Sequence, residues 1–158
     1  MRKSFAFLIS SIAAAALMTG CAKHPGAPSP EKVDMESAKR LKMPIVIYDV
    51  GVQRDDRGMS RPVVYFVNTS AAPVTLATFY VMGKTADGKS VMLWADDYEK
   101  VSPGKSSSNG MLGGSWNRGD VRCVEIKEAG VQIDGRNIRF SEENINQLFQ
   151  DTSINRCE

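Results

Sequence analysis

Three carboxylates follow a tryptophan in one short stretch, and they are the densest group of reactive side chains in the sequence. Asp96, Asp97 and Glu99 come directly after Trp94. Carboxylates this close together are candidate calcium ligands, but the spacing is not that of a calcium loop. No second, separated carboxylate accompanies them, as a glycosidase would require. We therefore predict a solvated acidic loop that binds no metal and is a candidate ligand-binding loop.

A second candidate is Trp116, which lies in the glycine-rich stretch 110–119. This stretch has neither of the glycine patterns that open a helix around a phosphate. We expect a loop between strands. An exposed tryptophan on such a loop would be an interface anchor, whereas a tryptophan packed under the loop would belong to the core, and we favour the second.

The sequence has few side chains that could serve in catalysis. The one histidine, His24, lies in a proline-rich stretch close to the N-terminus. A Ser-His-Asp triad in the folded body and a metal cage of several histidines are therefore excluded. We predict no catalytic residues, no cofactor and no enzymatic activity.

The N-terminus reads as a targeting segment. Arg2 and Lys3 precede the uncharged run 5–18, which is too short to span a membrane and is typical of a secretory signal peptide. The run ends in Leu-Met-Thr-Gly-Cys at 17–21, which resembles the lipobox of bacterial lipoproteins. The resemblance implies cleavage after residue 20 and a diacylglycerol on the Cys21 sulfur. It also implies acylation of the new amino group and, because Ala22 rather than Asp follows, sorting to the outer membrane.

Composition and charge narrow the class further. The chain has 158 residues, of which 42% are hydrophobic and 24% charged, as expected for a globular domain. Cleavage removes two of the 20 Lys and Arg residues and none of the 18 Asp and Glu residues, so the mature chain has no basic excess. Nucleic acid is therefore an unlikely partner. We expect a signal peptide over 1–20, a lipidated N-terminus and flexible tether over 21–43, and a folded domain over 44–158.

From residue 44 the hydrophobic period is two, which indicates strands. They are expected at 46–52, 63–67, 74–85, 91–94, 121–126, 131–133 and 138–140, with a short edge strand near Met111 and a bulge at 129–130. In the first strand Val46, Tyr48, Val50 and Val52 are expected on one face. A helix capped by Ser141 should follow and bury Ile145, Leu148 and Phe149. A short helix is also expected from Pro30 to about Leu41.

The strand pattern has a known counterpart. The runs 64–70, 73–74 and 79–81 resemble the central strands of small immunoglobulin- or fibronectin-like domains, and Trp116, Cys123, Ile126, 131–135 resemble the closing hairpin of some secreted bacterial domains of that kind. The resemblance covers about 60–140. The expected fold is mainly β: an immunoglobulin-like antiparallel β-sandwich of about seven strands with one C-terminal helix.

Two cysteines remain after Cys21 is lipidated. Cys123 and Cys157 would lie in an oxidising compartment, where one intramolecular disulfide is expected. A redox pair is disfavoured because no Cys-x-x-Cys is present, while free or intermolecular thiols stay open.

Three functions fit these features. The favoured one is a periplasm-facing outer-membrane lipoprotein, held by the lipid on Cys21, that acts as a non-enzymatic binding or accessory module for an envelope protein or other ligand. The second is a carbohydrate-binding or hydrolytic domain that uses the acidic loop 96–99. The third is a purely structural or assembly lipoprotein without a ligand.

Overall fold

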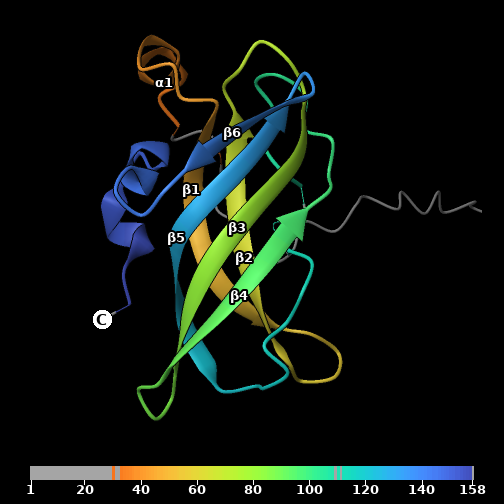
Figure 1. Ribbon diagram of the computed structural model, residues 1–158, viewed down its shortest axis with the longest axis vertical. Coiled ribbons are helices and arrows are strands. Elements are labelled where there is room, and N and C mark those ends of the chain that lie inside the picture. Colours follow the sequence, from red (N-terminus) through yellow and green to blue (C-terminus); the bar gives the residue numbers. More distant parts are fainter. Residues whose placement is uncertain (1–29, 31–32, 109, 111, 158) are drawn as a thin grey trace, which may run out of the picture.

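The computed structural model describes residues 30, 33–108, 110 and 112–157. Within them the chain is mainly β, with six strands in two antiparallel sheets rather than about seven strands (Figure 1). The strands are β1 (Ile45–Arg54), β2 (Ser60–Asn68), β3 (Val74–Thr85), β4 (Ser90–Asp97), β5 (Val121–Ile133) and β6 (Arg136–Phe140). The helices are α1 (Met35–Arg40) and two short 3-10 helices, η2 (Ile145–Leu148) and η3 (Thr152–Asn155).

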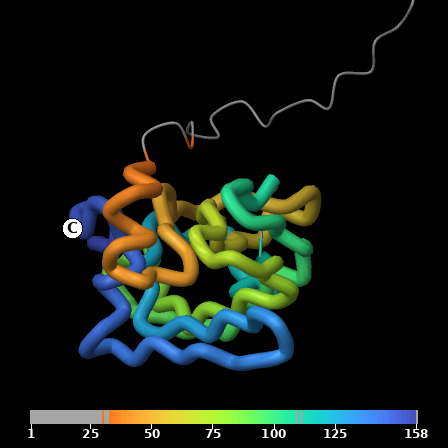
Figure 2. The backbone as a smooth tube through the Cα atoms, turned by 90° about the horizontal axis from the view of Figure 1, so that it is seen from above, coloured from red at the N-terminus to blue at the C-terminus, as the bar shows by residue number. Residues whose placement is uncertain are grey.

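The strands join as three hairpins. β1 and β2 form one sheet, and the second sheet has the order β4-β3-β5-β6. The predicted turns at Asp87-Gly88 and Asp134-Gly135 are confirmed: Gly88, Asp134 and Gly135 all have positive φ, which tight hairpin turns require. The two sheets lie face to face, as the view from above shows (Figure 2).

The core lies between the sheets. Phe66 of β2 and Phe79 of β3 are both fully buried, and their ring centroids are 6.4 Å apart. On β3 the inward side chains Ala77, Phe79 and Val81 alternate with the outward Leu76, Thr78, Tyr80 and Met82, as the period of two predicted. One face of the four-stranded sheet is thus used for the core, while the other face is left to solvent.

Two irregular segments close the gaps between the sheets. The stretch 105–112 donates and accepts hydrogen bonds along the free edge of β2, and Gly113 N–H then bonds to the Asp96 carbonyl of β4. On the opposite side, Phe149 bridges to Ile47 of β1, and Asn155 bonds through its side-chain amide to both backbone groups of Ile126 in β5. These contacts satisfy edge groups that would otherwise be unpaired.

Three details differ from the sequence prediction. The β1 register shifts at Tyr48, so that Ile45, Ile47, Val50 and Val52 face the core, and Val46 and Tyr48 do not share a face with the later valines. The two strands expected at 121–126 and 131–133 are one strand, β5. Its register against β3 shifts at Lys127 rather than at 129–130. A bulge changes the phase of the side-chain alternation, which the hydrophobic pattern alone does not locate. The strand expected near Met111 falls on a residue outside the described ones.

The helices differ as well. The helix expected after Ser141 is replaced by η2, whose N-cap is Asn144, and by η3. The predicted burial of Ile145, Leu148 and Phe149 is confirmed, because these side chains fill the gap between β1 and β5. Helix α1 begins after an Asp34 cap rather than at Pro30, and it ends at Arg40 with Leu41 as its C-cap, close to the expected end. It lies within the segment 21–43 assigned to the tether, and the Asp34 N–H donates to Gln150 Oε1 at 2.8 Å.

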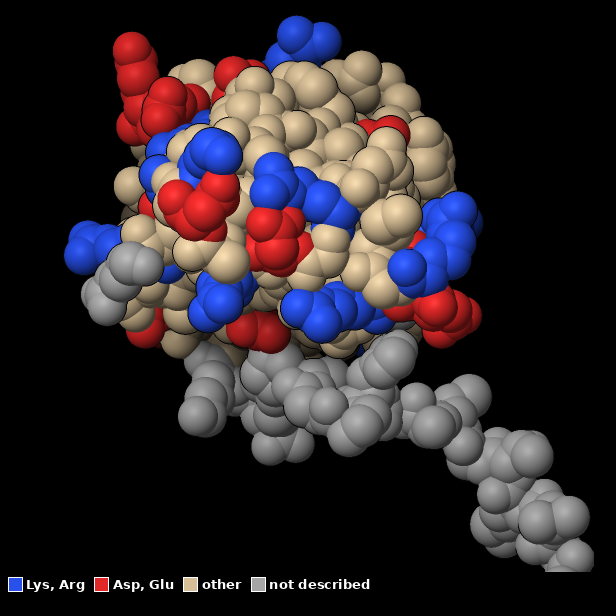
Figure 3. Space-filling model, turned by 90° about the horizontal axis from the view of Figure 1, so that it is seen from below, with Lys and Arg blue, Asp and Glu red and all other residues tan. Residues whose placement is uncertain are grey.

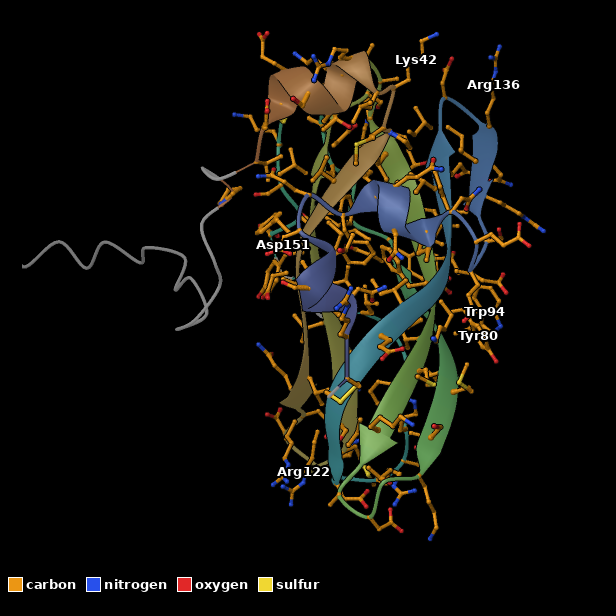
Figure 4. All side chains as sticks on the ribbon, turned by 90° about the vertical axis from the view of Figure 1, so that its left-hand side faces the viewer. Lys42, Tyr80, Trp94, Arg122, Arg136 and Asp151 are labelled. Atoms are coloured by element: carbon orange, nitrogen blue, oxygen red, sulfur yellow. A yellow bond between two sulfur atoms is a disulfide. The ribbon has the colours of Figure 1, made fainter. Side chains whose placement is uncertain are left out.

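Cys123 of β5 and Cys157 after η3 form a disulfide with a Cα–Cα distance of 5.6 Å (Figure 4, yellow bond). Cys123 points away from the core face that Val124 occupies. The Cys157 N–H also donates to Glu125 Oε1 at 2.9 Å. The chain end is therefore attached to the same strand that η2 and η3 pack against.

Replacing both cysteines, as Cys123→Ser with Cys157→Ser, should lower the free energy of unfolding by about 3–4 kcal/mol, because the bond closes a loop of sequence separation 34. Urea unfolding monitored by circular dichroism measures the change. Reductant should lower the stability of the native protein by a similar amount and leave the double variant unaffected. A double variant as stable as the native protein would contradict a structural role for this bond.

Candidate functional site

An aromatic pair lies on the outer face of the four-stranded sheet. Tyr80 and Trp94 are cross-strand partners on β3 and β4, and their rings stack with centroids 4.7 Å apart and an interplanar angle of 30°. Both project away from the β1–β2 sheet (Figure 4). Trp94 keeps 54% of its surface exposed although it is a large hydrophobic residue. Its exposure is therefore a feature that the core does not explain.

A hollow of about 450 Å³ opens beside Trp94 on the same face. Its lining comes from β3, β4, β5 and β6. Leu76, Thr78 and Gly130 lie along its floor, and Glu128, Asn137 and Arg139 stand around it with Trp94. We call this surface the outer-face hollow. Its size is within the range of small-ligand sites.

The three carboxylates of the acidic stretch, Asp96, Asp97 and Glu99, point in different directions. Asp96 lies on the outer face in the row next to Trp94, and its Oδ2 accepts from the Tyr98 hydroxyl at 3.1 Å. Asp97 lies on the opposite face of β4, where its Oδ1 accepts from the Glu99 N–H at 2.8 Å. Glu99 itself accepts from the Ser108 N–H at 2.8 Å. These carboxylates therefore hold the local backbone and do not converge on one point.

The position of Asp97 on the inner face of β4 affects its pKa. Burial raises the pKa of Asp97 above its ordinary value, and the Glu99 carboxylate adds to the increase, while the Glu99 N–H opposes it. Such a carboxyl is disfavoured in its charged form. In the part of the chain that the structure describes, no group of three or more His, Cys, Asp or Glu side chains is placed to hold a metal ion.

Trp116 is a core residue. It is only 7% exposed, and its ring lies against Gly83, where an added Cβ would be 3.1 Å from the indole and 2.7 Å from Val121. It therefore does not belong to an exposed binding loop with Trp94, and the reading of a tryptophan packed under its loop is confirmed. Gly83 provides the space that the ring occupies.

Acidic and basic side chains intermingle on the surface seen from below, so this face has no large patch of one charge (Figure 3). Several of them are paired, such as Asp87 with Lys89, Arg118 with Asp120, and Asp55 with Arg61. Over the described residues, no helix has the length and apolar character needed to cross a membrane.

Sequence reasoning found Trp94 but missed its neighbours. Nothing in the sequence pairs Tyr80 of β3 with Trp94 rather than with another residue of β4. Glu128, Asn137 and Arg139 carry no motif. They reach the hollow because of the registers of β5 against β3 and of β6 against β5.

The raised pKa of Asp97 gives a pH-dependent prediction. Its folded-state pKa lies above the unfolded one, so the charged carboxylate destabilises the folded protein at neutral pH, and this effect disappears as pH falls through the folded pKa. Asp97→Asn keeps an oxygen acceptor for the Glu99 N–H and should raise the free energy of unfolding at pH 7. The gain should shrink on acidification. Denaturant unfolding at pH 7 and at about pH 4 measures both, and a loss of stability at pH 7 would contradict the assignment.

Comparison with known proteins gives no family: no family model, curated protein or solved structure matches this chain.

Proposed function

We propose that this chain is a membrane-anchored lipoprotein of the cell envelope that acts as a non-enzymatic binding module. The observation that carries the proposal is the exposed Trp94, stacked on Tyr80 beside the outer-face hollow. An indole that is fixed by a neighbouring ring and left in solvent pays little conformational entropy when a ligand covers it. Tryptophans in such positions are frequent anchors of binding sites.

The anchor is proposed from the sequence, because residues 1–21 lie outside the described ones. Two or three acyl chains on Cys21 would hold the protein on a membrane, since each buried methylene contributes about 0.8 kcal/mol. Ala22 after the lipidated residue supports the outer membrane, with the body facing the periplasm. The tether would then hold the body away from the lipid headgroups.

A binding role is better supported than a hydrolytic one. The carboxylates of the acidic stretch bond to backbone N–H groups or to the Tyr98 hydroxyl, and they do not share a cleft. A general acid and base must both reach one reacting group. The carbohydrate-processing alternative at 96–99 therefore loses its proposed machinery.

We propose further that the body is of the immunoglobulin-like sandwich type. The order β4-β3-β5-β6 corresponds to strands C′, C, F and G of that fold. The stretch 105–112 hydrogen-bonds to β2 where strand E would lie beside strand B. These two correspondences support the assignment, and they put the outer-face hollow on the CFG sheet.

The anchor can be tested by mass and location. The mature protein should carry two or three acyl chains at its N-terminal cysteine and sediment with membranes. Cys21→Ser should lack the acyl mass and not be processed at residue 20. Cys157→Ser is the matched control, because it makes the same substitution at a cysteine of the disulfide and should leave lipidation intact. A native protein with an unmodified Cys21 thiol in the soluble periplasmic extract would contradict the anchor.

The binding surface can be tested in cells. A diazirine amino acid at Thr78, in the floor of the outer-face hollow, should capture envelope material on illumination, since a carbene inserts into C–H and O–H bonds of any close neighbour. The same amino acid at Gln53, on β1 of the other sheet, is the control. Adducts are detected by gel shift and mass spectrometry. Equal labelling from both positions would contradict a binding role for this face.

A further inference from the structure

A glycine, Gly130, lies in the lining of the outer-face hollow. Gly130 pairs with Thr78 of β3 on one side and with Arg139 of β6 on the other. The missing side chain leaves a gap between the row that contains Tyr80 and Glu128 and the row that contains Leu76 and Gln132. The backbone does not require glycine there: φ of Gly130 is outside the left-handed region, and an added Cβ would come no closer than 3.9 Å to Thr78.

The groups around the hollow are not used by the fold. Within the described residues, the side chains of Glu128, Asn137 and Arg139 make no hydrogen bond to another residue and no ion pair, although all three line the hollow. Gln132 bonds only to Thr75 through its side chain. The Glu128 carboxylate can therefore accept hydrogen bonds from a ligand, and the Arg139 guanidinium can donate them. The Asn137 amide can do both, and the exposed indole of Trp94 lies next to these groups. Glu128 and Arg139 leave it without net charge.

We propose that the outer-face hollow binds an oligosaccharide, which would be the ligand of the binding module proposed above and rests on that proposal. A sugar ring has a face of C–H bonds and a belt of hydroxyl groups. The C–H face fits the electron-rich face of the Trp94 indole. The hydroxyls both donate and accept, and they fit the planar side chains of Glu128, Asn137 and Arg139. A hollow of about 450 Å³ accommodates roughly two sugar rings.

Other ligand classes fit less well. A nucleic acid needs basic side chains along its phosphates, whereas the hollow is lined by one Arg and one Glu. An added peptide strand needs free backbone groups, which lie at sheet edges and not on the face where Thr78 and Gly130 are already paired on both sides. An acyl chain would leave the Glu128 and Arg139 charges desolvated without partners.

The test uses the full mature lipoprotein in a zwitterionic detergent without a sugar headgroup. Chitotetraose, cellotetraose and tetragalacturonate are the probes, titrated to millimolar concentrations. The two tryptophans give two indole N–H signals in an NMR spectrum. The Trp94 signal should shift with a sugar and the signal of the buried Trp116 should not. The probe that binds reports whether acetamido, neutral or acidic sugars are preferred.

Three variants separate recognition from folding. Trp94→Ala should weaken binding about tenfold or more, the equivalent of about 1.4 kcal/mol. Gly130→Val should weaken binding by a similar factor while thermal stability stays equal or rises, because the added side chain would project into the hollow and valine suits a strand better than glycine. Met92→Ala removes an exposed apolar side chain on the same face outside the hollow, and it should change affinity by less than about twofold.

Two results would overturn the inference. One is that none of the three oligosaccharides moves the Trp94 signal. The other is that Gly130→Val folds and binds as well as the native protein. If the diazirine at Thr78 captures a protein while the sugars fail, the binding module stands and its ligand is a protein instead. If Thr78 captures nothing and the sugars fail, both proposals are wrong.

Discussion

The contact between Phe66 and Phe79 is the interaction on which the rest of the structure depends. Within the described residues the two sheets share no ladder of hydrogen bonds, so they are held together by the apolar side chains between them, these two rings among them. A two-stranded sheet such as β1–β2 is marginal by itself and needs a packed face. Both sheets bury one face in the single core between them. The outer face of the four-stranded sheet is therefore not needed for packing, and Trp94 and Tyr80 can lie on it.

Polar side chains around the apolar core hydrogen-bond to backbone groups of the loops and strands. The Asn68 amide donates to the carbonyls of Ala72 (2.9 Å) and Val101 (2.8 Å), which ties the end of β2 to the loops beside it. Asn155 does the same for Ile126 at the other side of the body. The bond to the Val101 carbonyl is buried, and leaving such a group without a partner would cost about 1–3 kcal/mol. The irregular segments are therefore fixed parts of the body, and the sheet that carries the hollow is a rigid platform.

A sheet face with fixed side-chain positions suits the binding role that we propose. Side chains on a sheet face are spaced by the pleat and the ladder, so a ligand meets preset positions and little entropy is lost on binding. In the hollow, the regular rows of side chains on the sheet face lack one side chain, at Gly130. The acidic residues after Trp94 act differently: Asp97 and Glu99 cap backbone N–H groups where β4 ends, which explains their clustering without a ligand.

Features that depend on neighbours along the chain could be predicted from the amino-acid sequence alone. The alternation in β3, the turns at Asp87-Gly88 and Asp134-Gly135, and the burial of Ile145, Leu148 and Phe149 were all predictable, because side-chain period and turn chemistry are local properties. The tertiary structure decided what depends on pairing between distant residues. It placed the bulges at Tyr48 and Lys127, merged two expected strands into β5, buried Trp116 against Gly83, and brought Glu128 and Arg139 to the same hollow as Trp94. Register is set by the partner strand and by the fit of the whole core, so no pattern within one strand contains it.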